Sequence, residues 1–372
     1  MHLAFCSDNE AFSKDRLRDK QWSCRFPGSG WITCLYRMAS EEGIDVASGD
    51  VAIANITSKK WKVDDVFVIV ERHTVDATKL LDLGAKPFLI TCLEAPLYAP
   101  FFYDKICRVG AGFKFSMGFG FLEGKCGNVG PEKNLPFRFP SFYLDDMREP
   151  HPWNGRKKMV LVAANKYRTD KIFIPNYPSL KNLLRQLKSL GWRMASPAYR
   201  RALPASLHDR RLEVIEYFAG HKDLELYGAG WDSWDLLPTA WANRLEEVVS
   251  RQYRGRCGNK INAISDYKFS ICFENMVLPR YMTEKMVDCF VAGSIPMYWG
   301  APDIEMLVPN EAFVDMRKYS SNERANEYMS TMDEQAAMKM IQAGREYLKT
   351  EVGQLHSYEG FAKNVIRLAQ TC

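Results

Sequence analysis

Short apolar runs alternate with helical stretches along the first 150 or so residues of the chain. Runs that are apolar at nearly every position are typical of strands buried on both faces of a parallel sheet. Between them, apolar residues recur at helical spacing. The pattern predicts a mostly parallel βαβ sheet. Strands are expected at residues 2–6, 51–56, 66–70 and 87–93, and helices at 32–42 and 77–83.

The same alternation restarts after EPHPWNG at 149–155, whose Pro, Asn and Gly residues are typical of a linker. From Asp333 a helical pattern runs to the end of the chain. We therefore expect two Rossmann-like domains, at 1–152 and 153–340, and a helical tail at 341–372 that could pack back on the first domain. In the second domain, strands are expected at 159–163, 224–228, 268–273, 294–299 and 313–315, and helices at 180–190, 211–218 and 241–253.

Residues 267–300 combine a strand, a polar loop, a helix and a second strand in one short segment. Thr283 is well placed to cap the start of the helix. Ligands of open α/β sheets bind at the carboxyl ends of the strands, and a helix N-terminus attracts phosphate groups. The segment therefore predicts an anionic ligand, a phosphate or a diphosphate. The polar residues at this edge are Glu274, Asn275, Arg280, Tyr281, Glu284 and Lys285.

Composition places the chain among globular proteins: 372 residues, 47% hydrophobic and 26% charged, with a net charge of +5. The basic clusters come without a nucleic-acid-binding motif, so a nucleic-acid partner is not expected. An apolar run of about 18 residues and a signal-peptide pattern are both absent from the sequence. These observations predict either a cytoplasmic protein or a soluble catalytic domain lacking its leader.

The ten cysteines include no CxxC pair, and several of them fall inside apolar patterns. They are best interpreted as small buried hydrophobic residues in a reducing compartment, not as zinc ligands.

Sugar-nucleotide transfer needs a particular set of groups. Cations and helix N-termini hold the diphosphate and stabilise its departure. A carboxylate takes the proton of the acceptor hydroxyl. A further polar group steadies the sugar while its anomeric carbon gains positive charge, as in glycoside hydrolysis. Two α/β domains can hold donor and acceptor on opposite walls.

The segments YKFSICFEN, YMTEK, IPMYWGAP and FVDMRKY, all within 267–319, resemble in order and spacing the donor-binding signature of the α-1,3/1,4-fucosyltransferases (glycosyltransferase family 10), closest to the bacterial-type members. RRLEVIEYF…LELYG at 210–228 and LEAP at 93–96 are similar to two further elements of that family. The resemblance implies a GT-B fold, with two Rossmann-like domains facing each other across a cleft and a long C-terminal helix.

The resemblance also implies an inverting transfer of L-fucose from GDP-fucose to a hydroxyl, expected to be O3, of a GlcNAc-type residue. The acceptor would be an oligosaccharide, LacNAc-like or an N-glycan core. The family needs no metal at the reaction centre. The pairs Asp64-Asp65 and Asp145-Asp146 are interpreted as solvated turn acids.

Six residues receive roles from the resemblance. Glu94 would be the general base. Arg211 and Lys285 would bind the diphosphate, with Arg201 and Arg210 as alternatives to Arg211. Glu284 would hydrogen-bond the fucose and favour the positively charged transition state. Asn275 and Tyr281 would contact the nucleotide side of the donor.

The chain departs from the family pattern at named places. Ala95 stands where the family usually has serine, and the segment 165–211 is long, predicting an insertion over the nucleotide site or a decorated surface. The Gly- and aromatic-rich stretch 110–130 is interpreted as a loop that could act as a lid or a sugar platform. Two other functions stay open: a GT-B transferase for another nucleotide sugar, and a non-catalytic protein that binds glycans or nucleotide sugars.

Overall fold

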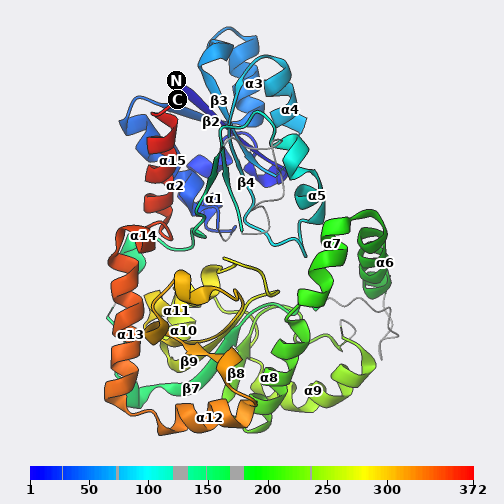
Figure 1. The fold of residues 1–372 in the computed structure, drawn as a ribbon, viewed down its shortest axis with the longest axis vertical. Helices are drawn as coiled ribbons and strands as arrows, with labels where there is room; N and C mark the ends of the chain where they lie inside the picture. The colour runs from blue at the N-terminus through cyan, green and yellow to red at the C-terminus, as the bar shows by residue number, and fades with distance from the viewer. Residues whose placement is uncertain (27, 73–74, 120–132, 148, 168–179, 235–236) are drawn as a thin grey trace. The chain divides into compact units, whose positions relative to one another are not determined.

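The computed structural model describes residues 1–26, 28–72, 75–119, 133–147, 149–167, 180–234 and 237–372 (Figure 1). The chain folds as two compact units. Unit 1 consists of residues 1–144 and 351–372, and unit 2 consists of residues 145–350. The sequence pattern suggested limits at 152 and 340 instead. Residues 145–152 lie with unit 2, where a Cβ at Gly293 would meet Pro150.

Unit 1 is built on a sheet of six parallel strands in its described part, in the order β2-β1-β3-β4-β5-β6. All six residues of β3 are buried, as expected for a strand near the middle of a covered sheet. The strands are β1 (His2–Ser7), β2 (Asp45–Ser48), β3 (Val66–Glu71), β4 (Lys86–Thr91), β5 (Phe115–Met117) and β6 (Lys133–Leu135).

The last helix of the chain belongs to the core of unit 1. Helix α15 packs along α2, where the ring of Trp31 meets that of Phe361 at 5.0 Å between centroids. Gly30 allows the contact because a Cβ there would overlap the ring of Tyr358. The described helices of this unit are α1 (Lys20–Ser23), α2 (Gly30–Glu41), α3 (Gly49–Thr57), α4 (Val75–Asp82), α5 (Pro100–Val109), α14 (Glu351–Gln354) and α15 (Tyr358–Ala369).

One predicted strand of unit 1 is wrong. Residues 51–56 lie inside helix α3, and the strand is the preceding segment Asp45–Ser48. The run VAIANI is apolar at most positions, and a short apolar run of this kind cannot be assigned to strand or helix by periodicity alone. Only Gly49 and Ala52 of α3 are buried, whereas three of the four residues of β2 are.

Unit 2 contains a second parallel sheet, whose described strands lie in the order β11-β10-β9-β7-β8. Strand β9 is central and lies between β7 and β10. Its last residue, Phe273, pairs with Trp299, the last residue of β10, so both strands end at the same edge. The strands are β7 (Lys157–Val162), β8 (Leu224–Tyr227), β9 (Tyr267–Phe273), β10 (Ile295–Trp299) and β11 (Val314–Asp315).

Two groups of helices accompany the sheet of unit 2. Helices α8 and α9 pack together, and α11 contacts both α10 and α13. The helical tail expected from Asp333 onward is divided into α13, α14 and α15, and the first of these belongs to unit 2. The described helices are α6 (Leu180–Ala195), α7 (Pro197–Ala202), α8 (His208–Gly220), α9 (Thr239–Gln252), α10 (Lys260–Ser265), α11 (Glu284–Ala292), α12 (Asn322–Thr331) and α13 (Glu334–Lys349).

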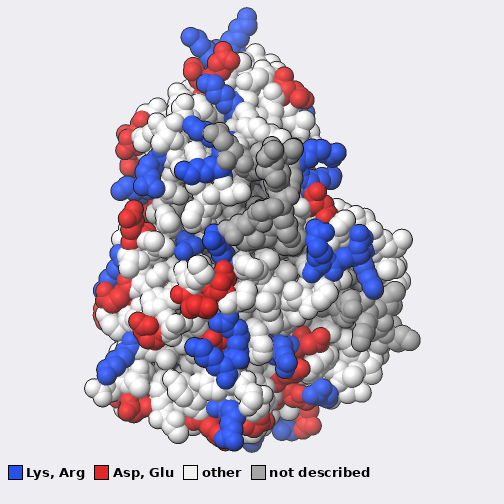
Figure 2. Space-filling model, in the orientation of Figure 1, with Lys and Arg blue, Asp and Glu red and all other residues white. Residues whose placement is uncertain are grey.

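Two sequence predictions fall partly outside the described residues. Residues 120–130 of the Gly-rich stretch 110–130 and residues 168–179 of the long segment 165–211 are not described. The described part of the Gly-rich stretch, expected as a loop, contains strand β5. The described remainder of the long segment includes α6 and α7. In the described ranges, none of the helices combines the length and apolar character needed to cross a bilayer. On the face drawn in Figure 2, basic and acidic side chains are interspersed.

Candidate functional site

The start of helix α11 is fixed by a buried carboxylate at the end of β9. Glu274 is fully buried and accepts hydrogen bonds from the Thr283 backbone N–H at 2.8 Å and from the Thr283 hydroxyl at 2.8 Å. Thr283 is the N-cap residue of α11, but its hydroxyl bonds Glu274 instead of capping the helix, so its predicted capping role is wrong. Glu274 therefore ties the loop after β9 to the first turn of α11.

Lys285 completes this anchor. Its Nζ donates to Glu274 Oε2 at 2.9 Å and to Thr283 Oγ1 at 2.9 Å. Burial acts to lower the pKa of Lys285, but the carboxylates of Glu274 and Glu284 outweigh it and hold that pKa above its usual range. Lys285 is therefore a cation at neutral pH, held in the first turn of a helix whose N-terminus is itself positive.

Glu284 is the first residue of α11 and lies between two lysines. Its Oε1 is 3.8 Å from Lys285 Nζ and 3.8 Å from Lys260 Nζ. Burial acts to raise the pKa of Glu284, but the charges of Lys285 and Lys260 outweigh it and hold that pKa at about 2. The Glu284 side chain is 32% exposed, so this ionised carboxylate can accept hydrogen bonds from a ligand at this edge.

Arg211, in the first turn of α8, locks the carboxyl end of β9 from another side. Its Nη2 donates to the carbonyls of Phe273 at 2.7 Å and Glu274 at 3.0 Å, and to Asn275 Oδ1 at 3.2 Å. Its charge acts on Lys285 and lowers the pKa of that lysine, against the two carboxylates. The structure thus brings Arg211, Asn275 and Lys285 to one edge of the sheet.

Tyr281 joins the same group. Asn275 Nδ2 donates to Tyr281 Oη at 3.3 Å, and the Tyr298 hydroxyl donates to the Tyr281 carbonyl at 3.0 Å. Tyr281 is only 2% exposed and Arg211 only 4%. Both side chains therefore support the loop 274–283 from within. Five of the six residues predicted from the sequence lie together here, in unit 2.

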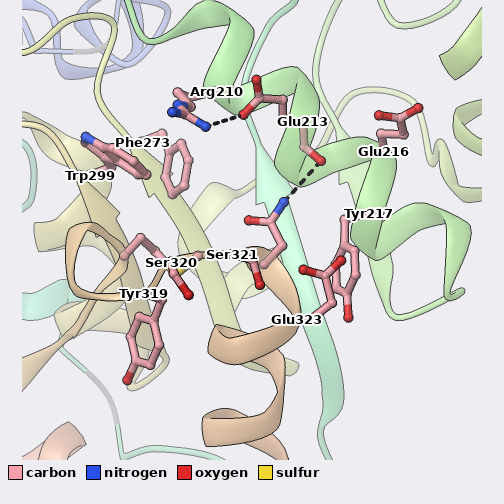
Figure 3. Close-up of a pocket in the computed structure, with 12 residues that line it drawn as sticks. Arg210, Glu213, Glu216, Tyr217, Phe273, Trp299, Tyr319, Ser320, Ser321 and Glu323 are labelled. Atoms are coloured by element: carbon pink, nitrogen blue, oxygen red, sulfur yellow. Dashed lines mark hydrogen bonds and ion pairs between the residues drawn. The ribbon is translucent and has the colours of Figure 1, made fainter.

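The neighbouring residue, Arg210, lines a pocket. A pocket of about 550 Å³ lies beside α8, and Arg210 forms part of its wall (Figure 3). There it pairs with Glu213 at 2.8 Å and lies 5.4 Å from the ring centre of Trp299. Arg201 is exposed on α7. Of the three candidate arginines, Arg211 is the one that bonds the carbonyls at the end of β9, while Arg210 lines a pocket that includes the last residues of β9 and β10. The pocket is lined by Arg210, Glu213, Glu216, Tyr217, Phe273, Trp299, Met316, Tyr319, Ser320, Ser321, Asn322 and Glu323.

Glu94, the sixth predicted residue, lies in unit 1. It follows the carboxyl end of β4, and its side chain is exposed. Its carbonyl accepts a hydrogen bond from the Tyr103 hydroxyl at 2.8 Å, which fixes the backbone of this loop. Ala95 is fully buried behind it, in keeping with a small apolar residue at this position.

Glu71 is a second carboxyl at this edge, and the sequence reasoning missed it. It is the last residue of β3, pairs with Ser7 of β1 and Thr91 of β4, and is 8% exposed. Ser7 Oγ donates to Glu71 Oε2 at 3.1 Å. Burial raises the pKa of Glu71; Arg72 and Ser7 oppose this, and Asp8 and Glu94 add to it. An acid directly after the apolar run VFVIV was the available signal.

Within the ranges that the structure describes, no three His, Cys, Asp or Glu side chains are grouped so as to hold a metal ion.

Solved structures of similar fold define the class. A glycosyltransferase from Rickettsia africae matches with a TM-score of 0.58 at 11% identity, over 100% of this chain and 98% of that one. Anabaena Alr3699/HepE in complex with UDP matches with a TM-score of 0.56 at 8% identity, over 100% of both chains. An α1,3-fucosyltransferase matches with a TM-score of 0.52 at 15% identity, over 100% of this chain and 89% of that one. The fold is that of the GT-B glycosyltransferases.

Sequence comparisons find similarity to one family over part of the chain. Residues 205–349 match the family described as glycosyltransferase family 10 (fucosyltransferase) C-term. The α-(1,3)-fucosyltransferase FucT of Helicobacter pylori is 27% identical over 114 residues, 30% of this chain and 24% of that protein. The human 4-galactosyl-N-acetylglucosaminide 3-α-L-fucosyltransferase 9 is 34% identical over 77 residues, 20% of this chain and 21% of that protein. The matched segments span about a quarter or less of these relatives. The segment that matches this family, 205–349, lies within unit 2.

Proposed function

We propose that the protein is an inverting fucosyltransferase, which moves L-fucose from GDP-fucose to a hydroxyl, O3, of a GlcNAc-type residue in a glycan. The observation that carries the proposal is the anchored start of α11. There a cationic lysine, Lys285, and an ionised carboxylate, Glu284, stand in adjacent positions of a family 10 domain. A donor with a diphosphate beside a sugar needs one group of each kind.

Unit 2 would bind the donor. Lys285 and the N-terminus of α11 would neutralise the diphosphate and the charge that develops on it as GDP leaves. Arg211 would add positive charge and keep the loop 274–283 in shape through its bonds to the β9 carbonyls. Asn275 and Tyr281 would contact the nucleotide side of the donor.

Glu284 would act on the fucose. A carboxylate with a pKa of about 2 is ionised at any physiological pH, so it can accept hydrogen bonds from sugar hydroxyls. It would also favour the positive charge that the anomeric carbon gains in the transition state, as carboxylates do in glycoside hydrolysis.

Unit 1 would bind the acceptor, an oligosaccharide that is LacNAc-like or an N-glycan core, and Glu94 would be the general base. The acceptor oxygen forms a bond to the anomeric carbon while the bond from that carbon to the phosphate oxygen breaks. GDP leaves with the electron pair, and the hydroxyl proton passes to Glu94. Attack from the side opposite to GDP inverts the configuration of the anomeric carbon.

The test combines donor binding with product analysis. Thermal-shift measurements with GDP, UDP and dTDP should show stabilisation by GDP. Incubation with GDP-fucose and an N-acetyllactosamine or chitobiose acceptor should give a product whose added mass is that of fucose, with the linkage assigned by NMR. Stabilisation by UDP alone would favour another nucleotide sugar. Binding of GDP-fucose without product from any tested acceptor would favour a non-catalytic protein.

Glu94→Gln tests the base. The amide cannot accept the proton, so transfer should fall by about a hundredfold or more, within the usual range for a general base. GDP-fucose binding, measured by calorimetry, should stay near that of the wild type. Glu42→Gln, at an exposed position after α2 in the same unit, is the matched control and should change neither quantity. Near-normal turnover of Glu94→Gln would remove Glu94 from the mechanism.

A further inference from the structure

Lys260 has no role in the function proposed above, although it lies beside Glu284. It is the first residue of α10, which packs against α11. Its Nζ forms a short ion pair with Asp288 Oδ2 at 2.6 Å and lies 3.8 Å from Glu284 Oε1. The Lys260 side chain is 28% exposed, whereas that of Asp288 is 6% exposed. A largely buried acid therefore holds this lysine next to Glu284.

Glu284 has two neighbouring lysines at the same distance, Lys260 and Lys285. Both lysines are 3.8 Å from the same carboxylate oxygen. This separation is too long for a hydrogen bond but short enough for strong electrostatic attraction. Each lysine is tied to another acid, Lys285 to Glu274 at 2.9 Å and Lys260 to Asp288 at 2.6 Å. Glu284 therefore lies between two cations whose positions are set independently of it.

Donor binding would disturb this balance on one side only. The proposed function assigns Lys285 to the diphosphate, whose negative charge would offset the charge of Lys285 near Glu284. Added negative charge favours the protonated form of a neighbouring carboxyl. Lys260, on the other side of Glu284, belongs to α10 and keeps its own acid, Asp288. It is thus the cation that can hold Glu284 ionised while the donor is bound.

We propose that Lys260, held in place by Asp288, is a positioning residue that keeps Glu284 charged and oriented toward the sugar of the donor. The inference rests on the proposed function, because it concerns the role of Glu284 in that reaction. The charged and titratable groups that act on Glu284 or on its two lysines come from four elements. They are Lys260 from α10, Lys285, Asp288 and Cys289 from α11, Cys272 from β9 with Glu274 directly after it, and Arg211 from α8.

The test is the pH dependence of transfer by Lys260→Met. Removing an opposite charge at this distance should move the acidic limb of the kcat profile, which reports the donor-bound enzyme, upward by about one pH unit. At a pH on that limb, kcat should fall about tenfold. The affinity for GDP, which lacks the sugar, should change less than about twofold. The preference for GDP-fucose over GDP, measured by calorimetry, should weaken as the pH falls.

Two further variants separate positioning from folding. Lys260→Arg keeps the charge and should restore most of the wild-type profile. Lys158→Met is the matched control, because Lys158 pairs with Asp223 at the same 2.6 Å and is 29% exposed, but it lies near the start of β7. It should leave the acidic limb unchanged. If Lys260→Met fails to bind GDP through misfolding, Lys260→Gln and Lys260→Arg give the same comparison.

The outcomes distinguish the two proposals. A wild-type protein that transfers fucose, with an acidic limb that is the same in Lys260→Met, would overturn the role of Lys260 and leave the proposed function in place. A wild-type protein without fucosyl transfer would overturn the proposed function, and the role of Lys260 with it.

Discussion

Buried carboxylates stand at the carboxyl edges of both sheets, and their surroundings differ. Glu274 accepts hydrogen bonds from the backbone and hydroxyl of Thr283 and from Lys285. Glu71 accepts one from Ser7, and its burial, with Asp8 and Glu94, outweighs Arg72 and raises its pKa. A buried carboxylate with several donors and a cation is well compensated, whereas one beside other acids is costly to ionise. Glu274 therefore supports the fold, and Glu71 weakens it when charged.

Glu71→Gln should stabilise unit 1, and the gain should depend on pH. Because the folded-state pKa of Glu71 is raised, the unfolded chain loses its proton first as the pH rises from the usual carboxyl range. The free energy of unfolding therefore falls as the pH rises from the usual carboxyl pKa to the raised pKa of Glu71. Glutamine does not titrate, so the Glu71→Gln protein should not show this fall. We expect a gain of about 0.5–2 kcal/mol at pH 8 and a smaller one at pH 4.5.

Thermal melts of both proteins at the two pH values measure this. Glu42→Gln serves as the exposed control in the same unit and should show no difference between the two pH values. A loss of stability at pH 8, or an equal gain at both pH values, would contradict the interpretation of Glu71.

Residues at the end of β9 could be predicted because an apolar run fixes where the strand ends and which polar residues follow. The anchoring role of Glu274 could not, because it depends on how the loop 274–283 folds back over the strand. The proximity of Lys260 to Glu284 arises only from the packing of α10 on α11. Pairings of this kind follow from tertiary structure and leave no local pattern.

At the scale of elements, α11 is held from behind by α13. Gly344 of α13 faces Phe290 of α11, and a Cβ at Gly344 would overlap the ring of Phe290. Phe290 is 1% exposed, so the ring has little room to move. The close approach of the two helices therefore requires glycine, and it fixes the helix that begins with Glu284 and Lys285.

Gly344→Ala should destabilise unit 2 by about 1–3 kcal/mol, the usual cost of overpacking a core. Gly191→Ala is the matched control, because Gly191 also lies in a helix, α6, and an added Cβ would meet no described atom within 4 Å. There alanine should stabilise by about 0.5–1 kcal/mol, since glycine is the poorer helix former. Denaturant unfolding measures both. A Gly344→Ala protein as stable as the Gly191→Ala protein would contradict this account of the α11–α13 contact.

The sequence pattern located most elements of both sheets but predicted a strand at 51–56, where the structure has a helix after a strand at 45–48. The strands of unit 2 were predicted well because each is a compact apolar run bounded by polar or turn residues. In segment 45–57, Ser48, Gly49 and Asp50 separate two short apolar runs, VA and VAIANI, either of which could be the strand. Which of two adjoining apolar runs joined the sheet depended on pairing with β1.

At the scale of the molecule, unit 1 is completed by the last residues of this chain. Phe361, Val365 and Ile366 of α15 are buried, and α15 packs on α2. The Lys114 ammonium also donates to the Thr371 carbonyl at 3.1 Å. The sequence pattern suggested that a tail packing on the first domain would begin at 341, but the change of unit lies ten residues later. The change of unit between Thr350 and Glu351 coincides with the end of α13.

Deletion of residues 351–372 should therefore unfold unit 1 and spare unit 2. The truncated chain would expose the surface of α2 around Trp31, which α15 covers in the full chain. We expect transfer to be lost, residues 1–144 to become sensitive to protease, and GDP still to raise the melting temperature of unit 2. Mass spectrometry of the proteolytic fragments measures the protease sensitivity of unit 1, and a thermal-shift assay measures the effect of GDP on unit 2. Protease resistance of 1–144 in the truncated chain would contradict the contribution of α15 to unit 1.

The two-part construction of unit 1 has a consequence for biosynthesis. The N- and C-termini lie close together in unit 1 (Figure 1), while unit 2 is one uninterrupted stretch of the chain. During synthesis from the N-terminus, every residue of unit 2 leaves the ribosome before α15 does. Unit 2 can thus reach its final structure while unit 1 is still incomplete. The unit that is begun first is finished last.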